Sequence, residues 1–271
     1  MEYVRYGSTG PLVSRLCIGT GHFARAYPDP QAGGRFLLSA LDRGVTFWDT
    51  AESYGSHPHV GAALREIERS RVVIQTKTTC KSRAEAAARI DAALREMGTD
   101  YLDVILLHAV NSPRDFRERA GALEAMLAAK AAGKVRCVGC STHVYTGPVM
   151  DAVTEVDEIE VILCTLNKGG TRLEGSIVDP DPNAPREPAV PSLAAHIAQV
   201  QRAYERGKGI SLMKVVGGGL TPEAERAEWI RWAFAFPYAH AVNLGMTYPS
   251  ELELDVRLEA EVRRERAREA A

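Results

Sequence analysis

The stretch Phe47-Trp48-Asp49-Thr50-Ala51-Glu52-Ser53-Tyr54-Gly55 decides the fold, because in it a strand-like apolar run ends abruptly in a carboxylate. Five residues after Asp49 comes Tyr54, at a position that favours a loop. Two later apolar runs end in the same way, at Lys77 and at His108. In a parallel α/β barrel the carboxyl ends of the strands converge on one face, where active sites lie. We therefore expect these four ionisable side chains to meet in one pocket.

The composition is that of a soluble globular protein, with 45% hydrophobic and 25% charged residues among 271. A single α/β barrel typically has about 250 residues. The net charge of −2 gives no electrostatic reason to expect nucleic acid or an anionic membrane as a partner. No apolar run approaches the roughly 20 residues that span a bilayer, and the N-terminus lacks a signal-peptide pattern. We therefore expect a cytoplasmic protein.

The five cysteines include one C-x-x-C pair, Cys137 and Cys140. An odd number of cysteines with irregular spacing argues against a disulfide framework. No second Cys or His pair follows at the spacing of a zinc site. The pair lies in a predicted strand, and alternation points the two side chains to opposite faces. This favours buried strand residues over a metal or redox site, and we expect no metal.

Apolar runs alternate with helical patterns along the whole chain. Strands are expected at residues 14–20, 45–49, 72–77, 102–108, 135–141, 160–165, 209–213 and 239–244. Helices are expected at residues 31–43, 59–69, 82–98, 112–133, 146–156, 192–205, from 221 onwards, and at 249–268. Such alternation predicts a parallel sheet, and eight units in this length favour a closed barrel. The prediction is a (β/α)8 TIM barrel over residues 1–271, as one domain, with an N-terminal β-hairpin in residues 1–13.

The rhythm breaks at residues 168–191, which are rich in glycine and proline. A loop of this length is unusual in a compact domain unless it is functional or flexible. It follows a strand, so it would lie on the catalytic face. Two interpretations stay open: a lid over the barrel mouth, or a passive surface insertion.

The four ionisable residues suit proton donation to a carbonyl oxygen. A free tyrosine has a pKa of about 10, and an ammonium group beside the phenol lowers it. Tyr54 would be the proton donor, Lys77 would tune it, and Asp49 would hold Lys77 charged. A neutral His108 could orient a substrate oxygen. None of the four can supply a hydride, so the reaction would need a nicotinamide cofactor.

Each of these residues alone is more often structural, as a loop tyrosine, a capping aspartate, a solvated lysine or a satisfied histidine. Together, at the ends of three consecutive strands, they are far more specific.

Several motifs resemble those of the aldo-keto reductases. They are residues 6–10 and 19–21, residues 49–55, residues 75–77, residues 106–108, residues 133–141, and residues 242–249. The resemblance implies a (β/α)8 barrel, NADPH or NADH lying extended across its mouth, and reduction of a small-molecule carbonyl substrate. Ser141-Thr142-His143 and Met213-Lys214 are similar to a bacterial subgroup, some of whose members add an iron–sulfur module. Because no cysteine follows Cys164, we expect that module to be absent.

The resemblance also carries over site positions. Cofactor positions are Gly19, Thr20, Gly21, Asp49, Ser141, Thr142, Cys164, Met213, Lys214, Gly217, Gly245, Met246, Thr247, Glu251 and Asp255. Substrate positions are Trp48, Tyr54, His108 and His143. Ser141 matches the residue that contacts the nicotinamide carboxamide, and Thr142 stands where asparagine is common. Cys164 aligns roughly where a glutamine holds the carboxamide, and Met213 stands where an aromatic often stacks.

The adenosine end departs from the family pattern. Members that prefer NADPH place basic residues after the eighth strand, to bind the 2′-phosphate. Residues 245–251 contain no Lys or Arg, and Glu251 falls where arginine is typical. A carboxylate repels a phosphate unless a cation intervenes. We therefore expect NADH to be used at least as well as NADPH.

Two other functions are consistent with parts of the pattern. A nucleotide-binding barrel with little turnover, serving as a regulatory subunit, is suggested by the altered nicotinamide positions. A phosphate-binding isomerase or lyase is suggested by Gly217-Gly218-Gly219 after the seventh strand, where barrels often bind phosphate. The physiological substrate and the oligomeric state cannot be predicted from these residues.

Overall fold

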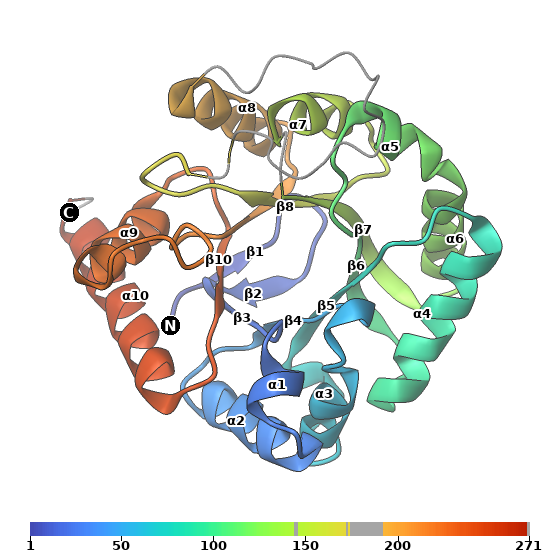
Figure 1. The fold of residues 1–271 in the computed structure, drawn as a ribbon, viewed down its shortest axis with the longest axis horizontal. Helices are drawn as coiled ribbons and strands as arrows, with labels where there is room; N and C mark the ends of the chain where they lie inside the picture. The colour runs from blue at the N-terminus through green and yellow to red at the C-terminus, as the bar shows by residue number, and fades with distance from the viewer. Residues whose placement is uncertain (144–145, 172, 174–191, 270–271) are drawn as a thin grey trace.

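A computed structural model describes residues 1–143, 146–171, 173 and 192–269. Eight parallel strands close into a barrel in the order β10-β3-β4-β5-β6-β7-β8-β9, and helices surround it (Figure 1). The strands are β3 Leu16–Gly19, β4 Phe47–Asp49, β5 Val73–Thr78, β6 Leu102–Leu107, β7 Val135–Thr142, β8 Val161–Thr165, β9 Gly209–Met213 and β10 Ala241–Gly245. The (β/α)8 barrel is therefore confirmed.

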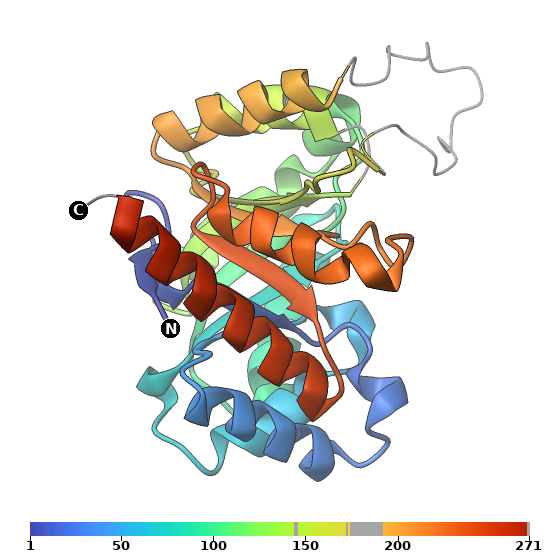
Figure 2. The same ribbon diagram turned by 90° about the vertical axis from the view of Figure 1, so that its left-hand side faces the viewer.

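The predicted N-terminal hairpin is also present. Strand β1 (Tyr3–Arg5) pairs antiparallel with β2 (Leu12–Ser14). The hairpin lies at the end of the barrel opposite to the β10 arrowhead (Figure 2). Behind it, the fully buried Tyr6 packs edge-on against Phe47, and its hydroxyl donates to Ser211 Oγ at 3.1 Å. The hairpin thus closes the amino-terminal end of the barrel and leaves the other end for the site.

The helices follow the predicted rhythm. They are α1 Phe23–Ala26, α2 Pro30–Asp42, α3 His57–Leu64, α4 Arg83–Met97, α5 Pro113–Glu118, α6 Ala120–Ala131, α7 Thr146–Thr154, α8 Leu193–Glu205, α9 Glu223–Ala235 and α10 Pro249–Glu269. Helix α4 has the expected ends, since the Ser82 hydroxyl accepts from the Glu85 amide and Gly98 adopts a φ of 65°. Such a cap and left-handed glycine satisfy backbone groups that a helix end leaves unpaired.

Two predicted helices differ in extent. The helix expected at 59–69 ends at Leu64, and a short 3-10 turn, Arg69–Arg71, precedes β5. The helix expected at 112–133 is divided at Arg119 into α5 and α6. The guanidinium of Arg119 is buried, where it pairs with Asp115 and donates to the His108 carbonyl at 2.7 Å. The division therefore fastens the end of β6, from which His108 projects.

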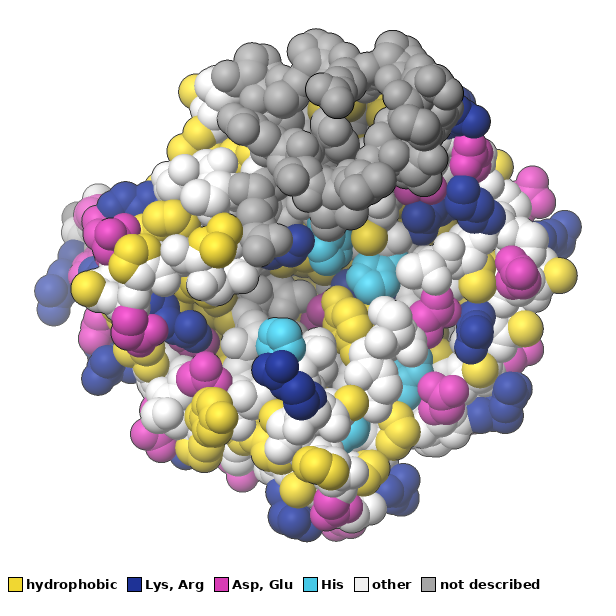
Figure 3. Space-filling model, viewed as in Figure 1, with side chains coloured by type: hydrophobic (Ala, Val, Ile, Leu, Met, Phe, Trp, Pro, Cys, Tyr) yellow, Lys and Arg dark blue, Asp and Glu magenta, His cyan; other side chains and the backbone are white. Residues whose placement is uncertain are grey.

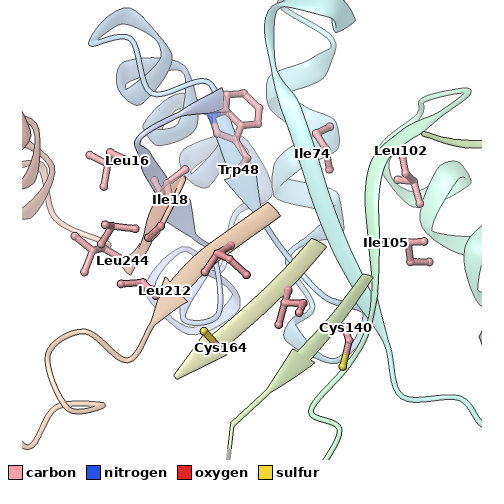
Figure 4. Packing of buried hydrophobic residues seen from close by; sticks show 14 of the residues in the cluster. Leu16, Ile18, Trp48, Ile74, Leu102, Ile105, Cys140, Cys164, Leu212 and Leu244 are labelled. Carbon is pink, nitrogen blue, oxygen red and sulfur yellow. The ribbon is translucent and has the colours of Figure 1, made fainter. Parts of the chain in front are cut away.

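The core has two layers separated by the strands. One cluster fills the barrel interior, with Phe47, Val104, Leu106 and Val161 among its members. A larger cluster lies between the strands and the helices (Figure 4). Successive strand residues alternate between the two, as the pleat requires.

The C-x-x-C pair follows the same alternation. Cys137 belongs to the interior cluster and Cys140 to the outer one, which confirms the prediction of opposite faces. Both are free thiols.

Two further predictions concern the 168–191 segment and membrane-spanning helices. Most of the 168–191 segment falls outside them, so both interpretations of it stay open. In the described ranges no helix is both long and apolar enough to cross a membrane.

Candidate active site

Three neighbouring segments bring the four ionisable residues together at the carboxyl end of the barrel. Asp49 ends β4, Lys77 lies near the end of β5, and His108 directly follows β6. Tyr54 ends a 3-10 turn, Glu52–Tyr54, that follows β4. The Lys77 Nζ lies 2.6 Å from Asp49 Oδ2 and 3.4 Å from the Tyr54 hydroxyl. The predicted convergence of Asp49, Lys77 and Tyr54 is therefore present; of the four predicted residues, Asp49 and Tyr54 line the cleft described below, whereas Lys77 and His108 do not.

The alternation of side chains along β4 and β5 explains why Asp49 and Lys77 face the barrel interior. Phe47 lies in the barrel interior, so Asp49, two residues later, points the same way. Its second oxygen accepts from Gln75 Nε2 at 2.7 Å, and Gln75 shares a face with Lys77. Lys77 also donates to the Thr50 carbonyl at 2.8 Å. Each buried charge is thus paired and hydrogen-bonded, which is the condition for keeping an ion pair in a low-dielectric interior.

Asp49, Lys77 and the Tyr54 hydroxyl form a relay, and the pKa values of Lys77 and Tyr54 follow from their burial and from the ion pair with Asp49. Burial alone would lower the pKa of Lys77, but the charges of Asp49 and Tyr54 and their hydrogen bonds raise it overall. Burial raises the pKa of Tyr54, Lys77 lowers it, and Asp49 raises it, so the net direction is upward. The expected lowering by the ammonium group is present, yet burial outweighs it. Tyr54 therefore stays protonated and can act as a proton donor.

His108 is held as a neutral imidazole. Burial first, and then the charges of Lys77 and Arg119, lower its pKa to about 3. Its ring lies edge-on to Tyr54, with 5.7 Å between ring centroids. Its Nδ1 is buried, and no described residue bonds it. A neutral histidine beside the phenol can orient a substrate oxygen without competing for its proton.

A cleft with a volume of about 500 Å³ opens beside this relay. The barrel-mouth face is hollowed near its middle, beside histidine side chains (Figure 3). The predicted residues that line the cleft are Gly19, Gly21, Asp49, Tyr54, His143, Met213, Lys214, Gly245 and Glu251. They come from all around the barrel mouth, so the cleft crosses the strand ends.

Two predicted site residues point away from the cleft. Trp48 was expected to line the substrate pocket, but it is fully buried among the outer cluster and its Nε1 donates to the Val45 carbonyl (Figure 4). Cys164 was expected to contact the carboxamide, but it also belongs to the outer cluster. Its neighbour Leu163 faces inward and lines the cleft. In both cases the pleat sends adjacent residues to opposite faces.

Ser141 and Thr142 lie beneath the cleft wall, since both are fully buried and neither lines the cleft. The Ser141 hydroxyl accepts from the Ala109 amide at 2.8 Å and lies 3.4 Å from the Leu107 carbonyl. Ser141 therefore supports the backbone on either side of His108, which differs from the carboxamide contact expected for it.

The remaining predicted cofactor positions support the cleft from behind. Those that do not line it are Thr20, Gly217, Met246, Thr247 and Asp255. Thr20, fully buried, donates its hydroxyl to the Asp49 carbonyl at 2.9 Å and so joins β3 to β4. Asp255 is fully buried, and burial raises its pKa to about 7, with Arg226 opposing and Glu251 adding to the rise.

Glu251 occupies the far end of the cleft. Its Oε2 accepts from the amides of Thr247 and Tyr248 at 2.7 and 3.0 Å, at the start of α10. Its Oε1 lies 3.8 Å from Nη2 of Arg226, which α9 contributes to the same cleft. A cation is therefore present at this end, although residues 245–251 contain none.

Sequence reasoning missed seven cleft residues. They are His22, Leu163, Val215, Val216, Arg226, Asn243 and Leu244. Strand alternation, applied to β8 and β10, would have found Leu163 and Asn243. Arg226 lies in the first turn of α9, far along the chain from the motifs of the site, so no local signal indicates it.

Comparison with known proteins gives a family match. The model of the Aldo/keto reductase family matches residues 15–165. The chain is similar to probable aldo-keto reductase 1 of Glycine max, with 30% identity over 158 residues, 52% of this chain and 45% of the relative. It is also similar to the aldo-keto reductase YhdN of Bacillus subtilis, with 29% identity over 195 residues, 66% and 57% of the two chains. The chain thus spans about half the length of these curated relatives.

Solved structures share the fold over nearly the whole chain. The protein PA4992 of Pseudomonas aeruginosa gives a TM-score of 0.76 with 22% identity, covering 96% of this chain and 95% of that one. The aldo-keto reductase AKR11C1 from Bacillus halodurans, in its holo form, gives 0.73 with 19% identity, covering 96% and 90%. At these identities the likeness shows the fold alone.

Proposed function

Because the chain belongs to the aldo/keto reductase family, we propose that it reduces an aldehyde or ketone to an alcohol with NADH or NADPH. The observation that carries the proposal is the chain of contacts from Asp49 through Lys77 to the Tyr54 hydroxyl, at 2.6 and 3.4 Å, whose two ends, Asp49 and Tyr54, line one cleft. Such a relay supplies a proton where a carbonyl oxygen could lie against both Tyr54 and His108.

The cleft suits a dinucleotide in size and lining. Its volume of about 500 Å³ lies within the range of small-molecule and cofactor sites. The turn after β9 has three consecutive glycines with positive φ, Gly217–Gly219, and two of them line the cleft together with Lys214. Bare backbone beside a cation can approach a pyrophosphate closely. Bound there, the dihydronicotinamide would supply the hydride that no side chain of the site can give.

The side chains divide the remaining work. The carbonyl carbon gains two electrons with the hydride, and the carbonyl oxygen gains the Tyr54 proton, so the products are an alcohol and the oxidised cofactor. Lys77, kept charged by Asp49, stabilises the phenolate that Tyr54 becomes. His108 donates a hydrogen bond to the same oxygen and orients it.

For the cofactor we propose that NADH is bound at least as well as NADPH. The Glu251 carboxylate already accepts from the two amides at the start of α10 and faces Arg226. These are the groups that would otherwise attract a 2′-phosphate. A phosphate placed there would have to displace or repel the carboxylate.

A second candidate is a barrel that binds the nucleotide with little turnover. It is favoured by two departures at the nicotinamide end: Ser141 is bonded to the backbone beside His108, and Cys164 faces away from the cleft. Such a protein would bind NADH without oxidising it in the presence of a carbonyl.

One experiment separates these functions. Dissociation constants for NADH and NADPH are measured first, and cofactor oxidation is then followed with a panel of aldehydes, ketones and quinones. Oxidation of NADH by at least one carbonyl supports the reductase, whereas tight binding without oxidation supports the second candidate. A hundredfold preference for NADPH would defeat the proposal on cofactor choice.

A further inference from the structure

His143 continues the row of rings that begins with Tyr54 and His108. It directly follows β7, and its carbonyl accepts from Thr165 Oγ1 at 3.2 Å. The His143 and His108 ring centroids lie 5.6 Å apart, nearly the same as the 5.7 Å between His108 and Tyr54. His143 also lines the cleft. A carbonyl compound that contacts Tyr54 and His108 at the edge of this row would therefore have His143 as a further polar neighbour.

The two imidazoles carry hydrogen-bonding capacity that the fold does not use. In the described part of the chain, neither Nε2 of His143 nor Nδ1 of His108 has a hydrogen-bond partner, although both atoms are buried. Buried polar nitrogens are normally bonded, so an unpaired one beside a cleft calls for a partner that the fold does not supply. The proposed function assigns His108 to the reacting carbonyl, whereas His143, which the family resemblance places among the substrate positions, takes no part in the proton transfer.

The surrounding charges decide what kind of group His143 meets. Burial first, then the charges of Lys214, the neighbouring His108 and Lys77, lower the His143 pKa to about 3. His143 is therefore neutral, with one N–H to donate. Both lysines disfavour a positive charge on the imidazole, and the N–H of a neutral imidazole needs an acceptor such as an oxygen with lone pairs. Of the cleft residues around His143, Leu163 and Met213 are apolar and Lys214 is cationic, so none of them is an acceptor that would bond the imidazole N–H.

We propose that His143 binds a second oxygen of the substrate, on the carbon next to the reacting carbonyl, and so selects vicinal dicarbonyl and hydroxycarbonyl compounds. The inference rests on the proposed reductase function. Hydrogen bonds of about 2.8 Å from two imidazoles in adjoining positions suit two oxygens of one small molecule. A site that binds a substrate oxygen discriminates strongly against the analogue without it, because the buried donor is then left unpaired.

The test compares 2,3-butanedione with 2-butanone, which differ by that one oxygen. The dione is intrinsically more reactive, so the quantity of interest is how the ratio of the two kcat/KM values changes on mutation. We expect His143→Leu to lower kcat/KM for the dione at least tenfold more than for the ketone. His143→Gln, which keeps a donor, should restore the ratio to within threefold of wild type. Met213→Leu, which reshapes the apolar wall without removing a donor, should change both substrates by the same factor.

The outcomes distinguish this inference from the proposed function. If both compounds are reduced and His143→Leu lowers both kcat/KM values equally, the inference is overturned while the reductase stands. If no carbonyl compound oxidises either cofactor, the proposed function itself fails.

If a His143 variant does not fold, the inference can still be tested on the wild-type protein. The imidazole ¹⁵N signals of His143 should shift on saturation with 2,3-butanediol in the presence of NAD⁺, and should not shift with 2-butanol. Equal responses to the two alcohols would also overturn the inference.

Discussion

At the scale of single residues, the inward-facing ion pair of Asp49 and Lys77 determines the surroundings of the Tyr54 hydroxyl. The pair is almost fully buried, with Nζ and Oδ2 2.6 Å apart, and the ammonium group donates hydrogen bonds to oxygens of Asp49, Thr50 and Tyr54. Burial raises the pKa of Tyr54 more than Lys77 lowers it. The relay therefore works by stabilising the phenolate after proton transfer, while the resting hydroxyl stays protonated.

Removing the Tyr54 hydroxyl should separate catalysis from binding. We expect Tyr54→Phe to lower kcat by roughly 10²- to 10⁴-fold, the usual contribution of a general acid, with the NADH dissociation constant within a few-fold of wild type. Steady-state kinetics and fluorescence titration measure the two quantities. Tyr204→Phe serves as the matched control, because Tyr204 stacks on His240 away from the cleft. Unchanged turnover in Tyr54→Phe would remove this residue from the proposed role.

The pH dependence should lack a histidine transition. The pKa values of His108 and His143 are lowered to about 3, and the pKa of Tyr54 is raised above its ordinary value of 10. Between pH 5 and 8 both imidazoles stay neutral and the phenol stays protonated, so kcat/KM for reduction should be flat. Activity should fall only in alkaline solution, where Tyr54 loses the proton it must donate. A transition between pH 6 and 7 that disappears in His108→Gln would contradict this assignment.

At the scale of elements, the start of α10 gathers charges that no single segment contains. Glu251 bonds the amides of Thr247 and Tyr248 and lies near Arg226 from α9. Asp255, one turn later, is fully buried, and neither of its oxygens has a hydrogen-bond partner in the described residues. The adenosine end therefore depends on how α9 and α10 meet.

Glu251→Gln should move the cofactor preference toward NADPH. The amide can still accept from the helix amides, but the negative charge is lost and Arg226 becomes available to a phosphate. We expect the ratio of NADPH to NADH affinity to rise roughly five- to fifty-fold, the range of one charge-assisted contact. Glu253→Gln, an exposed change on the same helix, should leave the ratio unchanged. No change in Glu251→Gln would show that the phosphate end does not reach α10.

Asp255 should make stability depend on pH. Its pKa rises from 3.8 to about 7 in the folded protein, so the folded state keeps a proton that the unfolded state loses in this range. Stability therefore falls as the pH rises from about 4 to 7 and stays reduced above it.

The variant Asp255→Asn should relieve that loss. Urea unfolding at pH 8 should show a gain, with an upper limit of about 4 kcal/mol set by the pKa difference. At pH 4 the variant and the wild type should agree closely. The exposed Asp42→Asn is the control and should show no such pH-dependent gain. An equal effect of Asp255→Asn at both pH values would contradict the linkage.

At the scale of the whole molecule, closure of the barrel and packing of the helices around it bury most of the cysteine thiols. Cys17, Cys137, Cys140 and Cys164 are buried, and only Cys80 is partly exposed. Burial raises the pKa of Cys137 to about 12 and that of Cys140 further, which suppresses the reactive thiolate.

Native protein treated with iodoacetamide should therefore be labelled first at Cys80, as peptide mass spectrometry would show. Protein unfolded in guanidinium should be labelled at all five cysteines. Rapid labelling of the C-x-x-C pair in the native protein would contradict the sealed barrel.

Much of this architecture was readable before any coordinates. Alternating apolar runs predicted eight strands and a closed barrel, and the same periodicity placed Asp49, Lys77 and His108 on one rim. It also placed Cys137 and Cys140 on opposite faces. The predictions for Trp48 and Cys164 were wrong because they were taken from motif positions alone. Side chains alternate along a strand, and this alternation points both residues away from the barrel interior.

The sequence by itself determined the barrel, the relay and the rim on which it lies, because strand periodicity is local and parallel strands bring their ends to one face. Only the tertiary structure decided how far burial raises the Tyr54 pKa, that Arg226 reaches Glu251 from another helix, and that His143 extends the row of rings. These properties depend on distances between segments far apart in the chain, and on how much water their packing excludes. No local pattern of residues contains that information.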